Sequence, residues 1–246
     1  MLAHSISIRQ ENNRTYRYAL RYIGTVARRK TKEHPAARPS VGRPSAVDVE
    51  NRIAHLLDMA AEVFMESGYE GTSVREIANR ANASKETIYS RFPSKAELFT
   101  AVMNRRCEQG FTRLADMLEG DKPIGQILTS FALELVTPTL DLQWKRLLRT
   151  IIGAAETFPD LGETFWRIGP ERAHVMIASC LSERMKKGEL RRADAGKAAH
   201  LFLAMTTGRY WLHDVLGIRP HVTRAEAEAY VKEIVPVFLS LYKRER

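Results

Sequence analysis

From Ser45 onward, apolar residues recur at intervals of three and four, which is the spacing of amphipathic helices. Ile53, Leu57 and Phe64 show this spacing in the first segment. No segment sustains the alternation of apolar and polar residues that is typical of a β-strand, so the pattern predicts an all-α fold. Beyond a group of N-terminal helices it predicts five further ones, over residues 122–136, 139–156, 163–188, 194–216 and 223–243.

Start and stop signals divide residues 46–119 into separate helices. Gly68 is typical of a helix end in the left-handed conformation, and Asn82 lies at a turn where Asn tolerates that conformation better than most residues. Ser73 and Ser94 are each followed three residues later by glutamate, which is the capping-box spacing of a helix start. Ser84 begins the helix between them. We therefore expect three helices followed by a long one that runs toward residue 119.

The second and third of these helices are separated by a turn of only a few residues, which is the helix-turn-helix arrangement. Ile77, Ala78 and Ile88 are the apolar positions that would hold the pair at a fixed angle. The later helix of such a pair enters the major groove of DNA, where base edges and phosphates are hydrogen-bonding surfaces. Its outward positions suit that role, because they are Lys85, Thr87, Tyr89 and Arg91.

The net charge of +9 is concentrated in the first 45 residues, which contain ten Lys and Arg against two Asp and Glu. A basic arm favours a polyanionic partner, of which nucleic acid is the commonest. The stretch HPAARPSVGRPS is typical of an extended linker, and we expect residues 1–45 to be disordered. Arg43 lies just before the first helix. It is a candidate for insertion into a narrow minor groove, and a solvated linker residue is the alternative.

The stretch EVFMESGYEGTSVREIANRANASKETIYSRFPSKAELFTAVM resembles the DNA-binding domain of the TetR/AcrR family of transcriptional regulators. The resemblance spans about residues 50–103 and depends on SGYEGTSVREIA, ETIYSRF and PSKAELF, which occur in order and at the family's spacing. The family often has Gly in place of Asn82 and His in place of Arg91. Both departures are physically mild, since Arg91 keeps a hydrogen-bond donor and adds charge.

The resemblance implies DNA contacts from the helix pair and its flanks, with Lys85, Glu86 and Thr87 near base edges and Tyr89, Arg91 and Lys95 on the DNA backbone. Simpler readings stay open: Tyr89 packs, Glu86 is a charge at a helix N-terminus, and the lysines are solvated. Ser73 and Val74 would lie at the DNA-facing start of their helix. With Arg43, the predicted DNA-binding residues are Ser73, Val74, Ser84, Lys85, Glu86, Thr87, Tyr89, Arg91 and Lys95.

The resemblance further implies that residues 46–103 form the DNA-binding domain and residues 104–246 a helical regulatory and dimerisation domain. Family members dimerise through their last two long helices, and the predicted interface residues are Tyr230, Val231, Ile234, Val235, Phe238 and Leu241. Burial in the chain's own core is the alternative for them. The stretch LLRTIIGAAETFPDLGETFWRIGPERA resembles, more weakly, a regulatory domain with a small-molecule pocket. Candidate lining residues are Trp144, Phe158, Phe165, Trp166, Met176, Tyr210 and Trp211, each of which is alternatively plain core.

Other functional classes have little support in the sequence. It contains no P-loop, G-x-G-x-x-G, G-x-S-x-G or H-E-x-x-H motif, so we expect no enzymatic activity, catalytic group, metal or cofactor. Cys107 and Cys180 are predicted to be free, buried thiols. No stretch is apolar enough to span a membrane, and we expect a cytoplasmic bacterial protein associated with the nucleoid. The expected partners are double-stranded DNA, a second copy of the chain and a small hydrophobic or aromatic effector. A non-specific architectural DNA binder that uses the basic arm is the alternative function.

Overall fold

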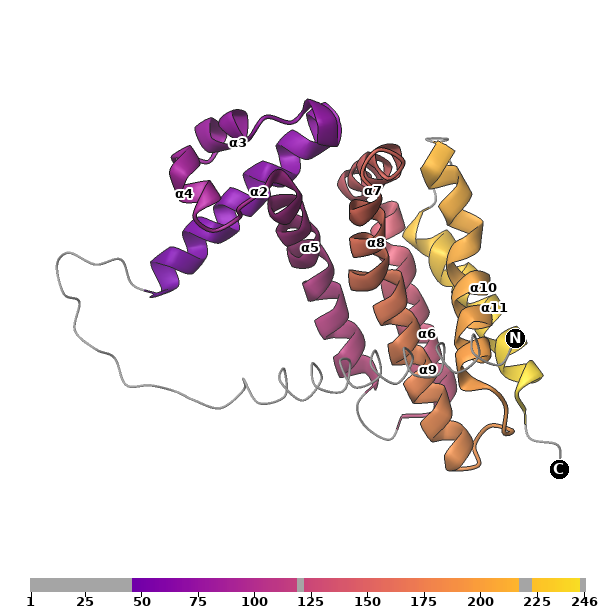
Figure 1. The fold of residues 1–246 in the computed structure, drawn as a ribbon. Coiled ribbons are helices and arrows are strands. Elements are labelled where there is room, and N and C mark those ends of the chain that lie inside the picture. Colours follow the sequence, from indigo (N-terminus) through magenta and orange to yellow (C-terminus); the bar gives the residue numbers. More distant parts are fainter. Residues whose placement is uncertain (1–45, 119–121, 217–222, 244–246) are drawn as a thin grey trace, which may run out of the picture. The chain divides into compact units, whose positions relative to one another are not determined.

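Helices form all the regular structure that the computed structural model describes, which is residues 46–118, 122–216 and 223–243 (Figure 1). The predicted all-α fold is confirmed. The elements in order are α2 (Ala46–Gly71), α3 (Val74–Arg80), α4 (Lys85–Tyr89), α5 (Lys95–Leu118), α6 (Ile124–Val136), the 3-10 helix η2 (Thr137–Leu140), α7 (Leu142–Ala154), α8 (Pro159–Ile168), α9 (Pro170–Lys186), α10 (Ala195–Leu216) and α11 (Arg224–Leu241). None of these helices combines the length and the hydropathy that crossing a membrane requires.

Buried apolar side chains form two clusters. One joins α2, α3, α4 and the first half of α5 with residues of α7 and α8. The other joins the second half of α5 with α6, α9, α10 and α11. Helix α5 therefore contributes to both clusters, and the domain boundary predicted at residue 103 falls inside it.

The helix-turn-helix is held by apolar contacts on its inner side and by a left-handed residue in its turn. Ile77 of α3 and Ile88 of α4 are almost completely buried. Asn82 has φ of 51°, as expected for this turn, and the N–H of Ala83 donates to the carbonyl of Ala78 at 2.9 Å. Gly68 also has a positive φ, of 69°, where the chain departs from helical geometry near the end of α2.

The helix predicted over residues 163–188 is wrong as a single element. The chain leaves helical geometry at Gly169, with φ of −114° and ψ of −91°, and α9 starts at Pro170. Proline has no N–H to donate and disfavours helical geometry in the residue before it, so the break belongs at this position. Pro159 begins α8 in the same way, because proline is well tolerated at the first helical position.

The Asn82 turn allows a direct test of the backbone argument. Asn82→Ala should lower the free energy of unfolding by about 1 kcal/mol, because alanine lacks the local hydrogen bonding with which asparagine offsets left-handed strain. Asn82→Gly should be neutral or stabilising. Asn79→Ala, at an exposed helical position of α3, is the matched control and should change little. Equal effects of Asn82→Ala and Asn79→Ala in urea denaturation would contradict the account.

Candidate DNA-binding surface and ligand cavity

The polar side chains of α4 share one outward surface. Ser84 caps the helix, since its hydroxyl accepts the N–H of Thr87 at 3.1 Å. The hydroxyls of Ser84 and Thr87 also lie 3.0 Å apart, within hydrogen-bond distance. Ile88 is the buried residue of α4, whereas Lys85, Glu86, Thr87, Tyr89 and Arg91 are exposed. The structure thus brings these predicted residues together on one accessible face.

At the start of helix α3, only one of the two predicted DNA-contacting residues is exposed. Ser73 is exposed, and its hydroxyl accepts the N–H of Arg75 at 3.2 Å. The expected capping box is incomplete, because Glu76 pairs with Arg80 at 2.7 Å. Val74 is buried in the apolar cluster of the helix-turn-helix. Its predicted DNA contact is therefore corrected to a packing role, since its side chain is covered by its own domain.

The side chain of Lys95 also makes its contacts within its own chain. Its Nζ donates to the carbonyl oxygens of Tyr69, Glu70 and Thr72 at 2.7, 3.2 and 3.2 Å, and it lies 4.7 Å from the centre of the Tyr69 ring. Partial burial lowers the pKa of Lys95. Its three donors cap the carboxyl end of α2, so the geometry gives Lys95 a structural role in place of the predicted phosphate contact.

Arg80 is a structural residue of this surface that the sequence analysis missed. Its Nη2 lies 2.6 Å from Glu66 of α2 and 2.7 Å from Glu76 of α3, so it ties the two helices together. The hydrogen bond from Arg80 lowers the pKa of Glu66. The spacing of Glu76 and Arg80 is a recognisable helical pair, but the contact with Glu66 depends on the fold. Arg43, the remaining predicted DNA contact, lies outside the described residues.

Glu86 keeps its charge at the start of α4. Hydrogen bonds from its own backbone N–H and from the Ser84 hydroxyl lower the pKa of its carboxyl. Ionised Glu86 therefore offers only acceptors to a partner. Lys85, its neighbour, offers only donors, and the α4 surface presents both kinds of group to a groove.

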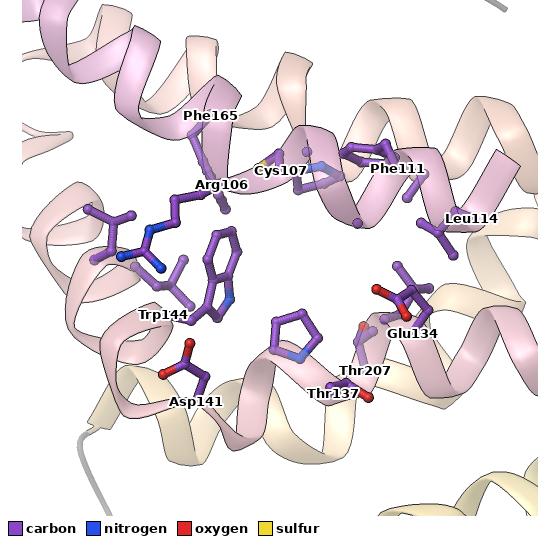
Figure 2. Close-up of a pocket in the computed structure, with 18 of the residues that line it drawn as sticks. Arg106, Cys107, Phe111, Leu114, Glu134, Thr137, Asp141, Trp144, Phe165 and Thr207 are labelled. Carbon is purple, nitrogen blue, oxygen red and sulfur yellow. The ribbon is translucent and has the colours of Figure 1, made fainter. Parts of the chain in front are cut away.

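A cavity of about 710 Å³ lies among α2, α5, α6, η2, α7, α8, α9 and α10 (Figure 2). Four predicted pocket residues line it: Trp144, Phe165, Trp166 and Trp211. The other three do not. Phe158 packs edge-on against Tyr69 at 5.0 Å, Met176 belongs to the regulatory core, and Tyr210 packs edge-on against Tyr230 at 5.6 Å. Core packing accounts for Met176 and Tyr210, whereas Phe158 is 36% exposed at its contact with Tyr69.

The sequence analysis did not identify the polar groups of the cavity. They include Glu134 and Asp141, the hydroxyls of Thr137 and Thr207, and the imidazoles of His174 and His200, whose rings stack at 3.8 Å. They come from α6, η2, α9, α10 and the N-cap of α7, and in the sequence each alone is indistinguishable from an ordinary surface residue. Cys107 also lines the cavity as a free thiol, and burial raises its pKa to about 11. Its reactive thiolate form is therefore scarce at neutral pH.

Three predicted interface residues face the chain's own core. Val231, Val235 and Phe238 are completely or almost completely buried within the regulatory cluster, so they cannot meet a second copy without unfolding. Tyr230 is half-buried, and its hydroxyl donates to the carbonyl of Met205 at 2.6 Å. Ile234 is half-buried, and Leu241 is 47% exposed. The broad apolar face of α11 thus mainly covers its own domain.

This architecture, a helix-turn-helix followed by a helical domain with an internal cavity, defines a helix-turn-helix DNA-binding protein with a ligand-binding domain. Residues 56–102 match the family of bacterial regulatory proteins described as tetR. Residues 126–244 match the C-terminal domain of AefR-like transcriptional repressors. The chain belongs to the TetR family of transcriptional regulators.

Individual relatives agree with this family. The chain is 35% identical over 86 residues to the transcriptional activator FasR of Mycolicibacterium smegmatis, a match that spans 35% of this chain and 38% of that protein. A TetR-family regulator from Mesorhizobium loti is similar in structure, with a TM-score of 0.70 and 27% identity over 79% of this chain and 98% of that one. The flavonoid-responsive regulator FrrA has a TM-score of 0.67 and 26% identity, and the match covers 80% of this chain and 100% of that one.

The two lysines near α4 should separate stability from DNA binding. Lys95→Met should lower the free energy of unfolding by about 2 kcal/mol, because three carbonyls, two of them in partly buried hydrogen bonds, lose a charged donor. Lys85→Met, on the exposed surface of α4, should leave stability unchanged and lower the affinity for the operator by about tenfold, because a proposed base contact is lost. Denaturation curves and DNA-binding titrations measure the two effects. Equal stability of the two variants would contradict the role given to Lys95.

Proposed function

We propose that this protein is an effector-responsive transcriptional repressor that binds a palindromic operator as a homodimer. The observation that carries the proposal is the surface of α4, where buried Ile88 fixes a short helix whose other side is entirely polar. A short helix with exposed donors and acceptors fits one major groove. Lys85, Glu86 and Thr87 are the proposed base readers, while Ser73, Tyr89 and Arg91 contact the DNA backbone.

Helix α10 supports the dimer, because its apolar residues are spread over more than one side of the helix. One side, including Phe202 and Tyr210, packs into the regulatory core. A second side lines the cavity through Leu203 and Trp211. The large apolar residues that stay exposed on α10 are Leu201, Leu212 and Leu216, and those on the neighbouring α11 are Val237 and Leu241; we assign these five residues to the dimer surface. These exposed residues replace the buried part of the predicted interface.

A two-fold dimer through this surface also suits the DNA-binding function. Isologous contacts between two copies generate a two-fold axis, and paired recognition helices on such an axis read half-sites about one helical turn of DNA apart. A non-specific architectural role for the chain is less well supported, because the relatives are transcriptional regulators. It also leaves the cavity without a purpose.

The cavity supports regulation by a small molecule. Its volume is within the range of pockets that enclose drug-sized ligands, and it is lined by the second half of α5, the helix that also packs against α2. FrrA, a structural relative, is named as flavonoid-responsive. Repression, as opposed to activation, of the target gene agrees with the description of the C-terminal match as AefR-like repressors, although FasR is named as an activator.

The exposed apolar surface gives the test of assembly. Leu212→Glu combined with Val237→Glu should convert the dimer to a monomer in light scattering, because four buried charges would face each other across the two-fold interface. Operator affinity should then fall by at least about a hundredfold through loss of the second half-site.

Ile152→Glu is the matched control, since Ile152 is an exposed apolar residue of α7 outside this surface. It should leave both the assembly and the DNA affinity unchanged. A wild-type protein that remains monomeric at micromolar concentration, or a double variant that remains dimeric, would overturn the proposed interface.

A further inference from the structure

The charged groups of the cavity are mostly paired with one another. Arg105 lies 3.3 Å from Asp58, Arg106 donates to the side-chain oxygen of Gln143 at 3.2 Å, and the Nε of Arg113 donates to Oε1 of Glu134 at 2.7 Å. The lining holds three arginines and three carboxylates, the third being Asp141. The cavity therefore carries no excess charge for a ligand to neutralise.

The carboxylates of the lining keep acceptor oxygens available. Both Nε and Nη2 of Arg113 contact Oε1 of Glu134. The other carboxylate oxygen of Glu134, Oε2, has no partner among the described residues. Oδ1 of Asp141 accepts the backbone N–H of Gln143 at 2.8 Å, and Oδ2 likewise has no partner within the described part of the chain. Figure 2 shows both carboxylates beside the open space of the cavity.

The hydroxyls and one imidazole add further acceptors. Thr137 donates its proton to the carbonyl of Leu133 at 2.7 Å, and Thr207 donates to that of Leu203 at 2.8 Å. Each hydroxyl oxygen therefore has only lone pairs left to offer. Nε2 of His174 lies 3.0 Å from the carbonyl of Gly196. Because a carbonyl only accepts, Nε2 must donate, and in the neutral ring Nδ1 is then an acceptor.

The remaining walls are apolar and combine aliphatic residues, such as Leu114 and Leu203, with aromatic ones. Phe111, Trp144 and Phe165 are among its aromatic residues (Figure 2), and the rings of Trp144 and Phe165 are 6.4 Å apart. The faces of such rings favour offset or edge-on contact with another aromatic ring. A planar aromatic ligand can therefore contact these rings with its faces and meet acceptors at its edges.

We infer, building on the proposed function, that the effector is an uncharged, planar aromatic compound whose hydroxyl groups donate hydrogen bonds to Glu134, Asp141 and the threonines. Every donor that meets one of these acceptor oxygens gains a hydrogen bond, whereas a carboxylate on the ligand would add a net charge to a cavity whose charges already balance. The inference therefore ranks uncharged hydroxylated aromatic compounds above fatty acids and aromatic acids as effectors.

Three probes test this chemistry: apigenin, which has three hydroxyls; flavone, which has the same ring system without them; and a flavone carboxylate. All three tryptophans of the protein line the cavity, so intrinsic fluorescence reports binding directly. Hydrophobic transfer alone ranks flavone first, because it is the most apolar of the three. The acceptors of the cavity reverse that order, and apigenin should bind at least about tenfold tighter than either other probe.

A pair of threonine variants assigns the effect to the cavity. Thr207→Val keeps the shape of the side chain, removes one acceptor, and should weaken apigenin binding about fivefold without weakening flavone binding. Thr129→Val is the matched control, because the Thr129 hydroxyl makes the same kind of bond, to Gly125 at 2.8 Å, and lies outside the lining. It should change neither affinity.

Flavone binding as tightly as apigenin, tighter binding of the carboxylate, or no quenching by apigenin at its solubility limit would overturn the inferred effector class. DNA affinity of the same preparations without any probe tests the proposed function separately. A protein that binds its operator and prefers flavone keeps its function and loses this effector. A protein that prefers apigenin but reads no DNA sequence loses the proposed function.

Discussion

The structure depends on the continuity of α5. Its 24 residues extend for about 36 Å at the helical rise, and one unbroken helix packs into both apolar clusters. Leu98, Phe99 and Val102 belong to the DNA-binding core, while Phe111 and Leu114 belong to the regulatory core and line the cavity. A backbone held by consecutive hydrogen bonds moves as a body, so a displacement of the cavity wall is also a displacement of the support of the helix-turn-helix. For the effector-responsive function that we propose, this means that effector and DNA change each other's affinity by the same factor.

Other contacts strengthen this connection between the two parts. Leu147, Ile151 and Leu161, from α7 and α8, lie in the core of the helix-turn-helix, and Leu147 also lines the cavity. Trp144 contacts both clusters. The division between the two apolar clusters therefore does not coincide with the domain boundary at residue 103 that the sequence resemblance predicts. The DNA-binding core is completed by side chains of the regulatory part, which places the ligand cavity one layer of side chains away from it.

Local rules and long-range contacts explain what the sequence could and could not predict. Helical periodicity and the turn at Asn82 are local, and both were readable. The apolar face of α11 was also readable, but periodicity does not say whether the chain's own core or a second copy covers it, and Val231 and Phe238 proved to be internal. Lys95 reaches a carbonyl 26 residues away, and Glu134 and Asp141 meet at the cavity from different elements. No spacing rule connects such groups before the chain is folded.

The central claim is that α4 reads a DNA sequence. The most direct measurement is a binding titration of the full-length chain on the DNA that flanks its own gene, compared with the same DNA after its near-palindromic segments are scrambled, at two salt concentrations. The account predicts a discrete protected site and a preference for the intact sequence of about a thousandfold or more. Equal affinity for both DNAs, with uniform and strongly salt-dependent coating, would contradict it and leave the basic arm as the main determinant of binding.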